Sequence, residues 1–255
     1  MKPLVIKIGG AILEKASALE ALLAAIKKLE NQAVVLVHGG GSSVDELLGK
    51  AGFTTEKKHG LRVTPLEQMP VIAGTLAGFV NKTIVAKANG LALNAVGLSL
   101  ADGNMVSCAL SDKDLGYVGV PTPNDNKLLN GLVAAQFLPV ISSIGALSTG
   151  ELVNVNADDA AVAVCQVLNG ELLLLTDVNG VRGADGEYLA TLNSSQANEL
   201  IASGVIAGGM TAKVNAALHA ANQLGKSIAV ASWQNPELIV NLVKGEAIGT
   251  RIQPN

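Results

Sequence analysis

The chain has 255 residues, 49% of them hydrophobic, and is long enough to bury one large core or two closely apposed lobes. Its 18 lysines and arginines stand against 21 aspartates and glutamates, giving a formal net charge of -3. No basic run of the kind that follows a nucleic-acid backbone is present, so a nucleic-acid partner is not expected.

The sequence also argues against disulfides, export and a membrane partner. Cys108 and Cys165 lie far apart in apolar surroundings, which is typical of reduced core cysteines. Lys7 interrupts the first apolar run, so this run does not resemble a signal peptide. The charge-free stretch 128–150 contains polar residues and Pro139, which favour a buried helix and strand over a membrane span. We therefore expect a cytoplasmic protein.

Short apolar runs alternate with helical patterns along the whole chain. Buried strands are predicted at residues 4–8, 34–37, 95–98, 139–141, 172–175 and 228–231. Alternating strands and helices predict an α/β fold, an αβα sandwich around an open, mainly parallel sheet. Aromatic residues make up only 2% of the chain, so Val, Leu, Ile and Ala must build the core, as in a parallel sheet.

Capping patterns predict where several helices begin. Ser17 with Glu20 and Ser43 with Glu46 have the spacing of a capping box, in which the serine stands just before the helix. Pro236 is expected at the first position of a C-terminal helix.

Two segments are expected to form antiparallel hairpins, at residues 105–120 and 179–186, the second because of its Asn-Gly and Asp-Gly turns. No linker divides the chain. We expect two lobes within one fold, residues 1–168 and 169–255, with a hinge near 168–170.

Glycine-rich turns follow the first two predicted strands, at Gly9-Gly10 and Gly39-Gly40-Gly41. Ligands bind at the carboxyl edge of open α/β sheets, and glycine lets backbone N–H groups approach anionic oxygens. Conformational need alone also explains such turns. The sequence contains neither the P-loop pattern nor the dinucleotide fingerprint.

Charged residues in unusual places are the next candidates. Lys7 stands within an apolar strand and must be paired or face a cleft, unless it alternates out to solvent. Lys213 follows a glycine pair at the start of a helix, and taken alone it is better explained as a solvated helix lysine. Asn156 or Asp158 can cap the next helix, which leaves Asn154 unexplained.

Two further residues are open to two interpretations. Arg62 suits a bidentate grip on a carboxylate or is an ordinary surface arginine. Asp177 follows the strand at 172–175 and belongs to a turn that could hold a nucleotide or be only a turn. The three histidines lack metal-ligand spacing, and no catalytic triad can be assembled, so hydrolase and metalloenzyme functions are disfavoured.

Six ordered motifs together resemble those of the amino-acid kinase family over essentially the whole chain. They are Lys-Ile-Gly-Gly (7–10), Val-His-Gly-Gly-Gly (37–41), Gly-Leu-Arg-Val-Thr (60–64), Asn-Val-Asn-Ala-Asp (154–158), Thr-Asp-Val-Asn-Gly (176–180) and Gly-Met-Thr-Ala-Lys (209–213). The resemblance implies an ATP-dependent kinase with its acceptor in the N-terminal lobe, which also forms the dimer, and MgATP in the C-terminal lobe.

The resemblance also implies roles for single residues. Lys7 and Lys213 would flank the transferred phosphoryl group, Asp158 would hold both lysines, and Gly10 and Gly40 would donate backbone N–H groups to it. The motifs around Arg62 and Asn154 imply that the acceptor is N-acetyl-L-glutamate. These two residues and the backbone of Gly40 and Gly41 would bind it. The nucleotide would be lined by Asp177, Val178, Asn179, Gly180, Val181, Arg182, Val205, Ile206 and Ala207. Ala207 and Gly208 stand where the family has a polar pair, which weakens the nucleotide assignment.

Phosphorylation of the γ-carboxylate of N-acetyl-L-glutamate would need no general base, because this carboxylate is already ionised at neutral pH. No protein ligand for a metal is expected, since Mg²⁺ would be held mainly by the nucleotide phosphates. Other acceptors, such as carbamate or UMP, and a catalytically silent ligand-binding protein remain the alternatives; a dehydrogenase lacks its fingerprint.

The resemblance bears on assembly as well. Arginine-sensitive relatives carry an additional N-terminal helix that links dimers into hexamers, whereas this chain reaches its first strand at Leu4. We therefore expect a homodimer that arginine does not inhibit.

Overall fold

The six predicted strands lie side by side in one eight-stranded sheet. The computed structural model describes residues 2–58 and 60–255. The order across the sheet is β12-β14-β13-β11-β1-β2-β8-β5. The predicted six are β1 (Leu4–Ile8), β2 (Val34–His38), β5 (Ala95–Ser99), β8 (Leu138–Ser142), β11 (Glu171–Thr176) and β13 (Ile228–Ser232); β12 (Thr191–Leu192) and β14 (Thr250–Ile252) were not predicted.

The sheet is mainly parallel, as predicted. Its central strands all run in one direction, and β14 alone is antiparallel to its neighbour β13 among the described pairs. Continuous apolar runs are the mark of strands buried on both faces. β2 and β8 are buried at every position.

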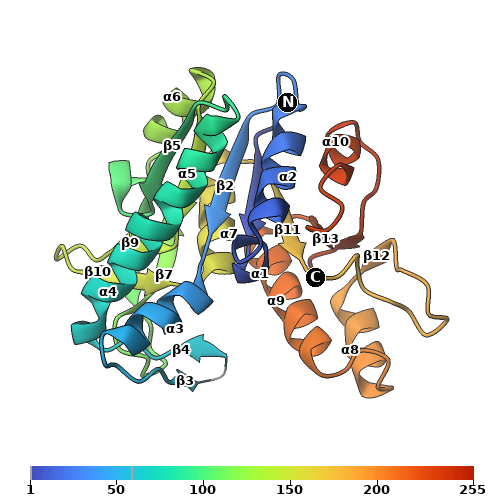
Figure 1. Ribbon diagram of the computed structural model, residues 1–255. Helices are drawn as coiled ribbons and strands as arrows, with labels where there is room; N and C mark the ends of the chain where they lie inside the picture. The colour runs from blue at the N-terminus through green and yellow to red at the C-terminus, as the bar shows by residue number, and fades with distance from the viewer. Residues whose placement is uncertain (1, 59) are drawn as a thin grey trace.

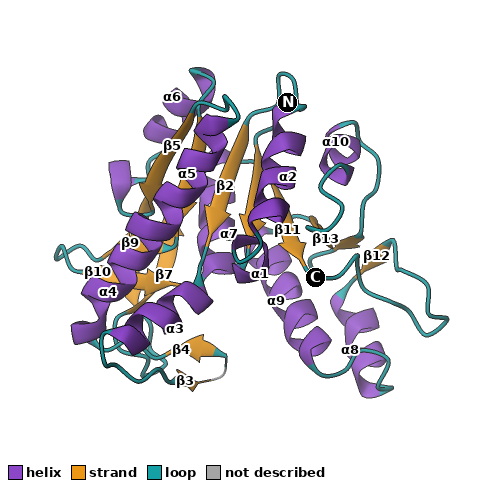
Figure 2. Cartoon of the chain, viewed as in Figure 1, coloured by secondary structure: helices purple, strands orange, loops and turns teal. Residues whose placement is uncertain are grey.

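Helices cover both faces of the sheet, which confirms the predicted αβα sandwich (Figures 1 and 2). Leu4, Ile6 and Ile8 pack on one face and Val5 on the other. The first face contacts α2 (Ala16–Lys27), α5 (Asn81–Gly90) and α10 (Leu238–Val243). The second contacts α6 (Lys127–Ala134), α7 (Ala157–Leu168), α8 (Ser194–Ala202) and α9 (Gly209–Leu224).

A smaller four-stranded sheet has the order β6-β7-β10-β9. Its strands are β6 (Val106–Leu110), β7 (Val118–Pro123), β9 (Ile144–Ala146) and β10 (Leu152–Val155). The antiparallel β6-β7 pair confirms the hairpin predicted at 105–120. The second predicted hairpin is reduced to a single antiparallel bridge between Arg182 and Tyr188.

The two capping boxes were predicted wrongly. α2 begins at Ala16 and α3 (Gly41–Lys50) at Gly41, so Ser17 and Ser43 lie inside these helices and cap neither. α10 begins at Leu238, beyond Pro236, which lies in the preceding turn. The cap of α7 is confirmed, because the side chain of Asn156 accepts hydrogen bonds from the backbone N–H groups of Asp158 and Asp159.

The segment 66–90 forms one long helical stretch with a π-helical turn in its middle. It comprises η1 (Leu66–Gln68), α4 (Met69–Ala73), the π-helix η2 (Gly74–Val80) and α5. By length and composition alone the stretch could cross a membrane, but 44% of its most apolar window is buried within the fold. The core helix of a soluble protein passes the same test.

The remaining elements are short. They are α1 (Gly10–Leu13), the 3-10 turn η3 (Asp102–Asn104) and a small hairpin of β3 (Lys57–Lys58) and β4 (Leu61–Arg62).

The predicted lobe boundary coincides with the turn between α7 and β11. Asn169 ends α7 in a left-handed conformation with φ of 49°. Because β11 pairs directly with β1, the main sheet continues across this boundary. The assignment of separate tasks to the two lobes remains a prediction.

Both cysteines are free. Cys165 is buried, and burial raises the pKa of its thiol to about 12. Cys108 is partly buried and packs against the same core.

Candidate functional site

Two pockets at the carboxyl edge of the sheet gather most of the residues singled out from the sequence. The first has a volume of about 430 Å³ and lies between the ends of β1 and β11, α1, α9 and the start of α7. The second has about 230 Å³ and lies beside the glycine turn after β2. We call them the phosphoryl pocket and the acceptor pocket, after the roles that the sequence resemblance predicts for their residues. Ala157 lines the acceptor pocket and Asp158 the phosphoryl pocket, so the first turn of α7 stands between them.

Lys7 meets its partner at the start of α7. It shares with Val5 the face of β1 that α7 covers. Its Nζ atom lies 2.9 Å from Oδ1 of Asp158, with the two side chains 18% and 26% exposed. The apolar run of β1 thus contains a charge because that charge is paired and faces a pocket, as expected for a lysine in such a strand.

Lys213 enters the same pocket from the first turns of α9. Its Nζ atom pairs with Oδ1 of Asp177, which follows β11. The hydrogen bond from Lys213 holds the pKa of Asp177 below its usual value. The resemblance assigns both lysines to Asp158; in this structure Asp158 pairs with Lys7, and Lys213 pairs with Asp177.

Gly10 lines the phosphoryl pocket at the start of α1. A Cβ atom at this position would lie 3.3 Å from Oγ of Ser42, which is closer than ordinary van der Waals contact. Glycine thus allows the turns after β1 and β2 to approach each other.

Gly40 needs glycine for two reasons. Its φ of 152° is rarely adopted by residues with a side chain. An added Cβ atom would also lie 3.0 Å from Leu76 and 3.2 Å from Val80, two residues of the π-helix η2. The glycine turn is therefore fixed by its own backbone and by the helix packed behind it.

Arg62 and Asn154, which the resemblance assigns to one substrate, both line the acceptor pocket. One guanidinium nitrogen of Arg62 lies 2.6 Å from Oδ1 of Asp45, and another donates to the carbonyl of Gly41 at 3.2 Å. Asn154 donates from Nδ2 to Oγ1 of Thr64 at 3.1 Å.

The Arg62 side chain is only 9% exposed. Burial favours the neutral form of Asp45, but the hydrogen bond and charge of Arg62, together with the charge of Lys57, outweigh it, so the pKa of Asp45 lies below its usual value. The pair presents a fixed guanidinium at the pocket wall.

The residues predicted for the nucleotide are more dispersed. Within the described part of the chain, Asp177 alone of this set lines the phosphoryl pocket. Val181 is buried, and its N–H donates to Oγ1 of Thr250 at 2.8 Å. Arg182 donates to the hydroxyl of Tyr188 at 3.3 Å on the surface. Residues 205–207 lie in the loop between α8 and α9, where Ile206 belongs to the core.

Sequence reasoning missed Trp233 and Asp45. Trp233 follows β13, lines the phosphoryl pocket and lies under Lys15, whose Nζ is 5.1 Å from the ring centroid. Its position directly after a buried strand is the signal that could have revealed it. Nothing in the sequence pattern marks Asp45, because its role depends on the fold bringing α3 against β4.

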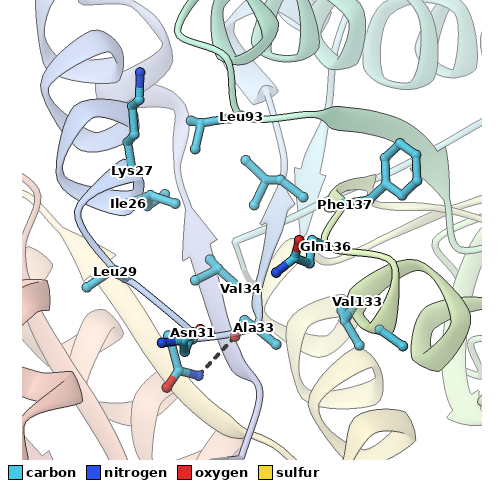
Figure 3. Close-up of a pocket in the computed structure, with 13 residues that line it drawn as sticks. Ile26, Lys27, Leu29, Asn31, Ala33, Val34, Leu93, Val133, Gln136 and Phe137 are labelled. Carbon is cyan, nitrogen blue, oxygen red and sulfur yellow. Dashed lines mark hydrogen bonds between the residues drawn. The ribbon is translucent and has the colours of Figure 1, made fainter.

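Figure 3 shows a different pocket, at the opposite edge of the sheet, with a volume of about 400 Å³. It lies where β2 and β8 begin, among Leu29, Leu93 and Phe137. It contains none of the predicted site residues that the structure describes. Across residues 2–58 and 60–255 no group of three or more His, Cys, Asp and Glu side chains could hold a metal ion. His59, considered for metal binding from sequence, lies outside this described part.

A parallel α/β sandwich with two lysine–aspartate pairs and glycine turns at its carboxyl edge is suited to binding and transferring an anionic group. Residues 2–232 match the model of the amino acid kinase family. The chain is 71% identical to the acetylglutamate kinase of Colwellia psychrerythraea, over 100% of this chain and 98% of that relative. This chain belongs to the amino acid kinase family.

Solved structures agree with this assignment. The protein smu.665 from Streptococcus mutans UA159 has a TM-score of 0.79 and 28% identity, over 99% of this chain and 98% of that one. A carbamate kinase from Giardia lamblia bound to AMP-PNP has a TM-score of 0.70 over 100% of this chain and 99% of that one. At 20% identity, the carbamate kinase shows the shared fold alone.

Proposed function

We propose that this chain transfers the γ-phosphoryl group of ATP to the γ-carboxylate of N-acetyl-L-glutamate, giving N-acetyl-L-glutamyl 5-phosphate, the second step of arginine biosynthesis. The observation that carries the proposal is the identity of 71% to an acetylglutamate kinase over the full chain. The site agrees with it, because a pocket with two lysines adjoins a pocket lined by a partly shielded arginine.

The chemistry explains why these residue types suffice. The attacking carboxylate is ionised at neutral pH, so the enzyme need not remove a proton. What the reaction requires is alignment of two anions and positive charge around a phosphoryl group whose charge spreads over its oxygens. In this proposal Lys7 and Lys213 supply the charge, and the N–H groups of Gly10 and Gly40 supply oriented donors. Asp158 holds Lys7 in place.

The acceptor would lie between the glycine turn and β4. Arg62 would bind the carboxylate that does not react, and Asn154 and the backbone of Gly40 and Gly41 would bind the remaining polar groups. The partly shielded guanidinium supports this assignment, because a charge-assisted bidentate contact is strongest where water is excluded.

The nucleotide would occupy the C-terminal lobe, residues 169–255, and the acceptor the N-terminal lobe, residues 1–168. Lys7 and Lys213 come from opposite lobes, so the phosphoryl group would be transferred at their junction. Residues 177–182 and 205–207 would line the nucleotide. Mg²⁺ would enter with ATP, held mainly by the phosphates, and would neutralise charge on the transferred group.

We also propose a cytoplasmic homodimer formed through the N-terminal lobe. Phe79 and Leu66, 64% and 52% exposed, lie on the long helical stretch at the surface of this lobe. Exposed apolar side chains mark a contact surface where they form a contiguous patch, and this proposal requires that Phe79 and Leu66 belong to one. A dimeric mass by light scattering that falls to a monomer in Phe79→Asp would support this interface, and a monomeric wild type would contradict it.

The direct test is trapping of the acyl phosphate product with hydroxylamine. The purified protein would be incubated with MgATP and, in separate reactions, N-acetyl-L-glutamate, glutamate, aspartate, carbamate and UMP, with ADP release measured in parallel. We expect a hydroxamate with N-acetyl-L-glutamate at a rate far above that with glutamate. Preference for carbamate or UMP would indicate another member of the family, and no turnover with any acceptor would indicate a silent binding protein.

A further inference from the structure

His38 is a buried imidazole at the end of β2, directly before the glycine turn, and no role has yet been given to it. The side chain is inaccessible to solvent. Its Nδ1 atom lies 2.8 Å from the carbonyl oxygen of Gly39, and its Nε2 atom lies 3.0 Å from Nδ2 of Asn81. Both ring nitrogens therefore have partners.

The surroundings of Asn81 determine which ring nitrogen carries the proton. Nδ2 of Asn81 lies 2.9 Å from the carbonyl oxygen of Val140 and 3.2 Å from that of Leu98. Carbonyl oxygens can only accept, so this atom of Asn81 is the donor nitrogen of the amide. An N–H at Nε2 of His38 would face this donor, so Nε2 is the acceptor that shares the two amide hydrogens with the two carbonyls. The proton of a neutral ring then lies on Nδ1, where it donates to the carbonyl of Gly39. Burial lowers the pKa of His38 to about 4, which keeps the ring neutral at neutral pH.

The Asn81 amide fits its buried position because the neighbouring residue in β5 is a glycine, Gly97. Asn81 is inaccessible to solvent and is the first residue after the π-helix η2. A Cβ atom at Gly97 in β5 would lie 2.0 Å from Oδ1 of Asn81. Lys82 also donates to that oxygen, at 3.2 Å. Because π-helical turns inside helices occur frequently at functional sites, the position of Asn81 next to one is notable.

The hydrogen bond to Gly39 controls the direction of the next N–H group. In a trans peptide the carbonyl of one residue and the N–H of the following residue point in opposite directions. The described residues contain no cis peptide bond. With the Gly39 carbonyl held toward His38, the N–H of Gly40 points away from the ring. Leu76 and Val80 close off the other side of Gly40.

We propose that His38 and Asn81 are positioning residues that lock the Gly39–Gly40 peptide, so that the N–H group of Gly40 faces the phosphoryl group during transfer. This inference rests on the proposed function, in which Gly40 is one of the donors. His38 acts only through this peptide and touches neither substrate. Asn81 fixes the ring as the Nδ1-protonated tautomer.

The kinetic test compares two substitutions of one histidine. His38→Leu removes the donor to Gly39, whereas His38→Asn retains an N–H donor at about the distance of Nδ1 from the backbone. We expect kcat to fall about tenfold to a hundredfold in His38→Leu and less in His38→Asn. The reason is that an N–H group of Gly40 that no longer faces the phosphoryl group stabilises the transition state less. KM for ATP should change by less than about threefold, whereas KM for N-acetyl-L-glutamate should rise, because the backbone of Gly40 also belongs to the proposed acceptor site. His219→Gln, at an exposed histidine, is the matched control and should leave kcat unchanged.

The tautomer provides a second measurement that needs no variant to be active. Long-range proton–nitrogen NMR spectra of the wild type should show one neutral histidine protonated at Nδ1, and that signal should be missing from His38→Asn. Protonation at Nε2 instead would overturn the inference. So would a kcat in His38→Leu within about threefold of wild type, or a loss confined to folding stability measured in urea. A wild type that forms no acyl phosphate would instead refute the proposed function, before any variant is compared.

Discussion

Lys7 and Asp158 form an ion pair of 2.9 Å between the second-to-last residue of the first strand and the first turn of a helix more than half the chain away. Neither side chain is more than 26% exposed. The helix cap at Asn156 fixes the backbone of this turn, so the carboxylate is held where the lysine reaches it.

Replacing Lys7 should therefore affect the chemical step. Lys7→Ala should lower kcat by about a hundredfold or more, the loss expected for one preorganised donor. Lys7→Arg should not restore it, because a broad planar guanidinium does not fit the place of a point charge. Single-turnover phosphoryl transfer measures this step, and a near-normal rate in Lys7→Ala would contradict the role.

A double-mutant cycle tests whether Asp158 acts through Lys7. Asp158→Ala should also lower kcat, and the double variant with Lys7→Ala should lose much less than the product of the two single losses. The same cycle with Lys213→Ala should show weaker coupling, since Lys213 pairs with Asp177. Equal coupling to both lysines would show that Asp158 contacts both when substrates are bound.

The pair of Lys213 and Asp177 should matter for catalysis and little for folding. Its side chains are 39% and 52% exposed, and exposed ion pairs contribute between about 0 and 1 kcal/mol. Lys213→Ala should lower kcat by about a hundredfold or more, with a urea midpoint close to that of wild type. A large loss of stability with an unchanged rate per folded molecule would reverse this assignment.

Arg62→Ala should act mainly on acceptor binding. Losing a charge-assisted hydrogen bond costs roughly 1.5 to 3 kcal/mol, which corresponds to a rise in KM for N-acetyl-L-glutamate of about tenfold to a hundredfold. KM for ATP should stay near its wild-type value. Initial rates at varied concentrations of each substrate would show this, and a defect in ATP affinity alone would place Arg62 at the other ligand.

Gly40, directly before α3, and Gly49, inside α3, allow the effect of the same substitution to be compared at two glycines. Gly40→Ala should destabilise the protein by about 1 to 3 kcal/mol, because φ is 152° and the new Cβ would lie 3.0 Å from Leu76. Gly49→Ala meets nothing within 4 Å and should stabilise by up to about 1 kcal/mol. Urea unfolding of both variants gives the comparison, and similar stabilities would mean that the turn relaxes.

The sequence predicts what depends on local pattern. Strands buried on both faces appear as continuous apolar runs, and for this reason the central strands of the sheet were found. β12 and β14 were missed, since two or three residues at a sheet edge carry no periodic signal. Ser17 and Ser43 match a capping pattern but lie two and three residues too late, because Lys15 and Gly40 are the N-cap residues of these helices.

The candidate site likewise contains residues that the sequence reveals and contacts that only the fold creates. Lys7 could be singled out because a charge in an apolar strand is anomalous, and Arg62 and Asn154 through the family motifs. Asp45 could not be singled out, and Asp177 was predicted to line the nucleotide and not to pair with Lys213, because both ion pairs form only through tertiary packing. The π-helix η2 likewise has no local sequence signature, although it places Val80 and Asn81 against the glycine turn.

Acidification should weaken the fold through His38. Burial lowers its pKa from the ordinary 6.5 to about 4, while a backbone hydrogen bond to Gly39 opposes the shift only in part. Between these pH values the unfolded chain binds a proton that the folded protein does not, so the free energy of unfolding falls as the pH drops from 6.5 to 4. The slope approaches about 1.4 kcal/mol per pH unit.

The pKa values of Asp45 and Asp177 are lowered from their ordinary 3.8, so these two carboxyl groups change the stability only below pH 3.8, outside this window. Urea unfolding of wild type and His38→Asn at several pH values between 7 and 4 isolates the effect of the histidine. The stability advantage of wild type over the variant should shrink by roughly 3 kcal/mol across the window, the product of that slope and the width of the shift. His219→Gln, at a histidine that is 63% exposed and lies 3.8 Å from Asp159, should change the pH dependence much less than His38→Asn does. Parallel pH profiles for wild type and His38→Asn would mean that the buried ring takes up its proton near 6.5, and that the network around Asn81 does not hold it neutral.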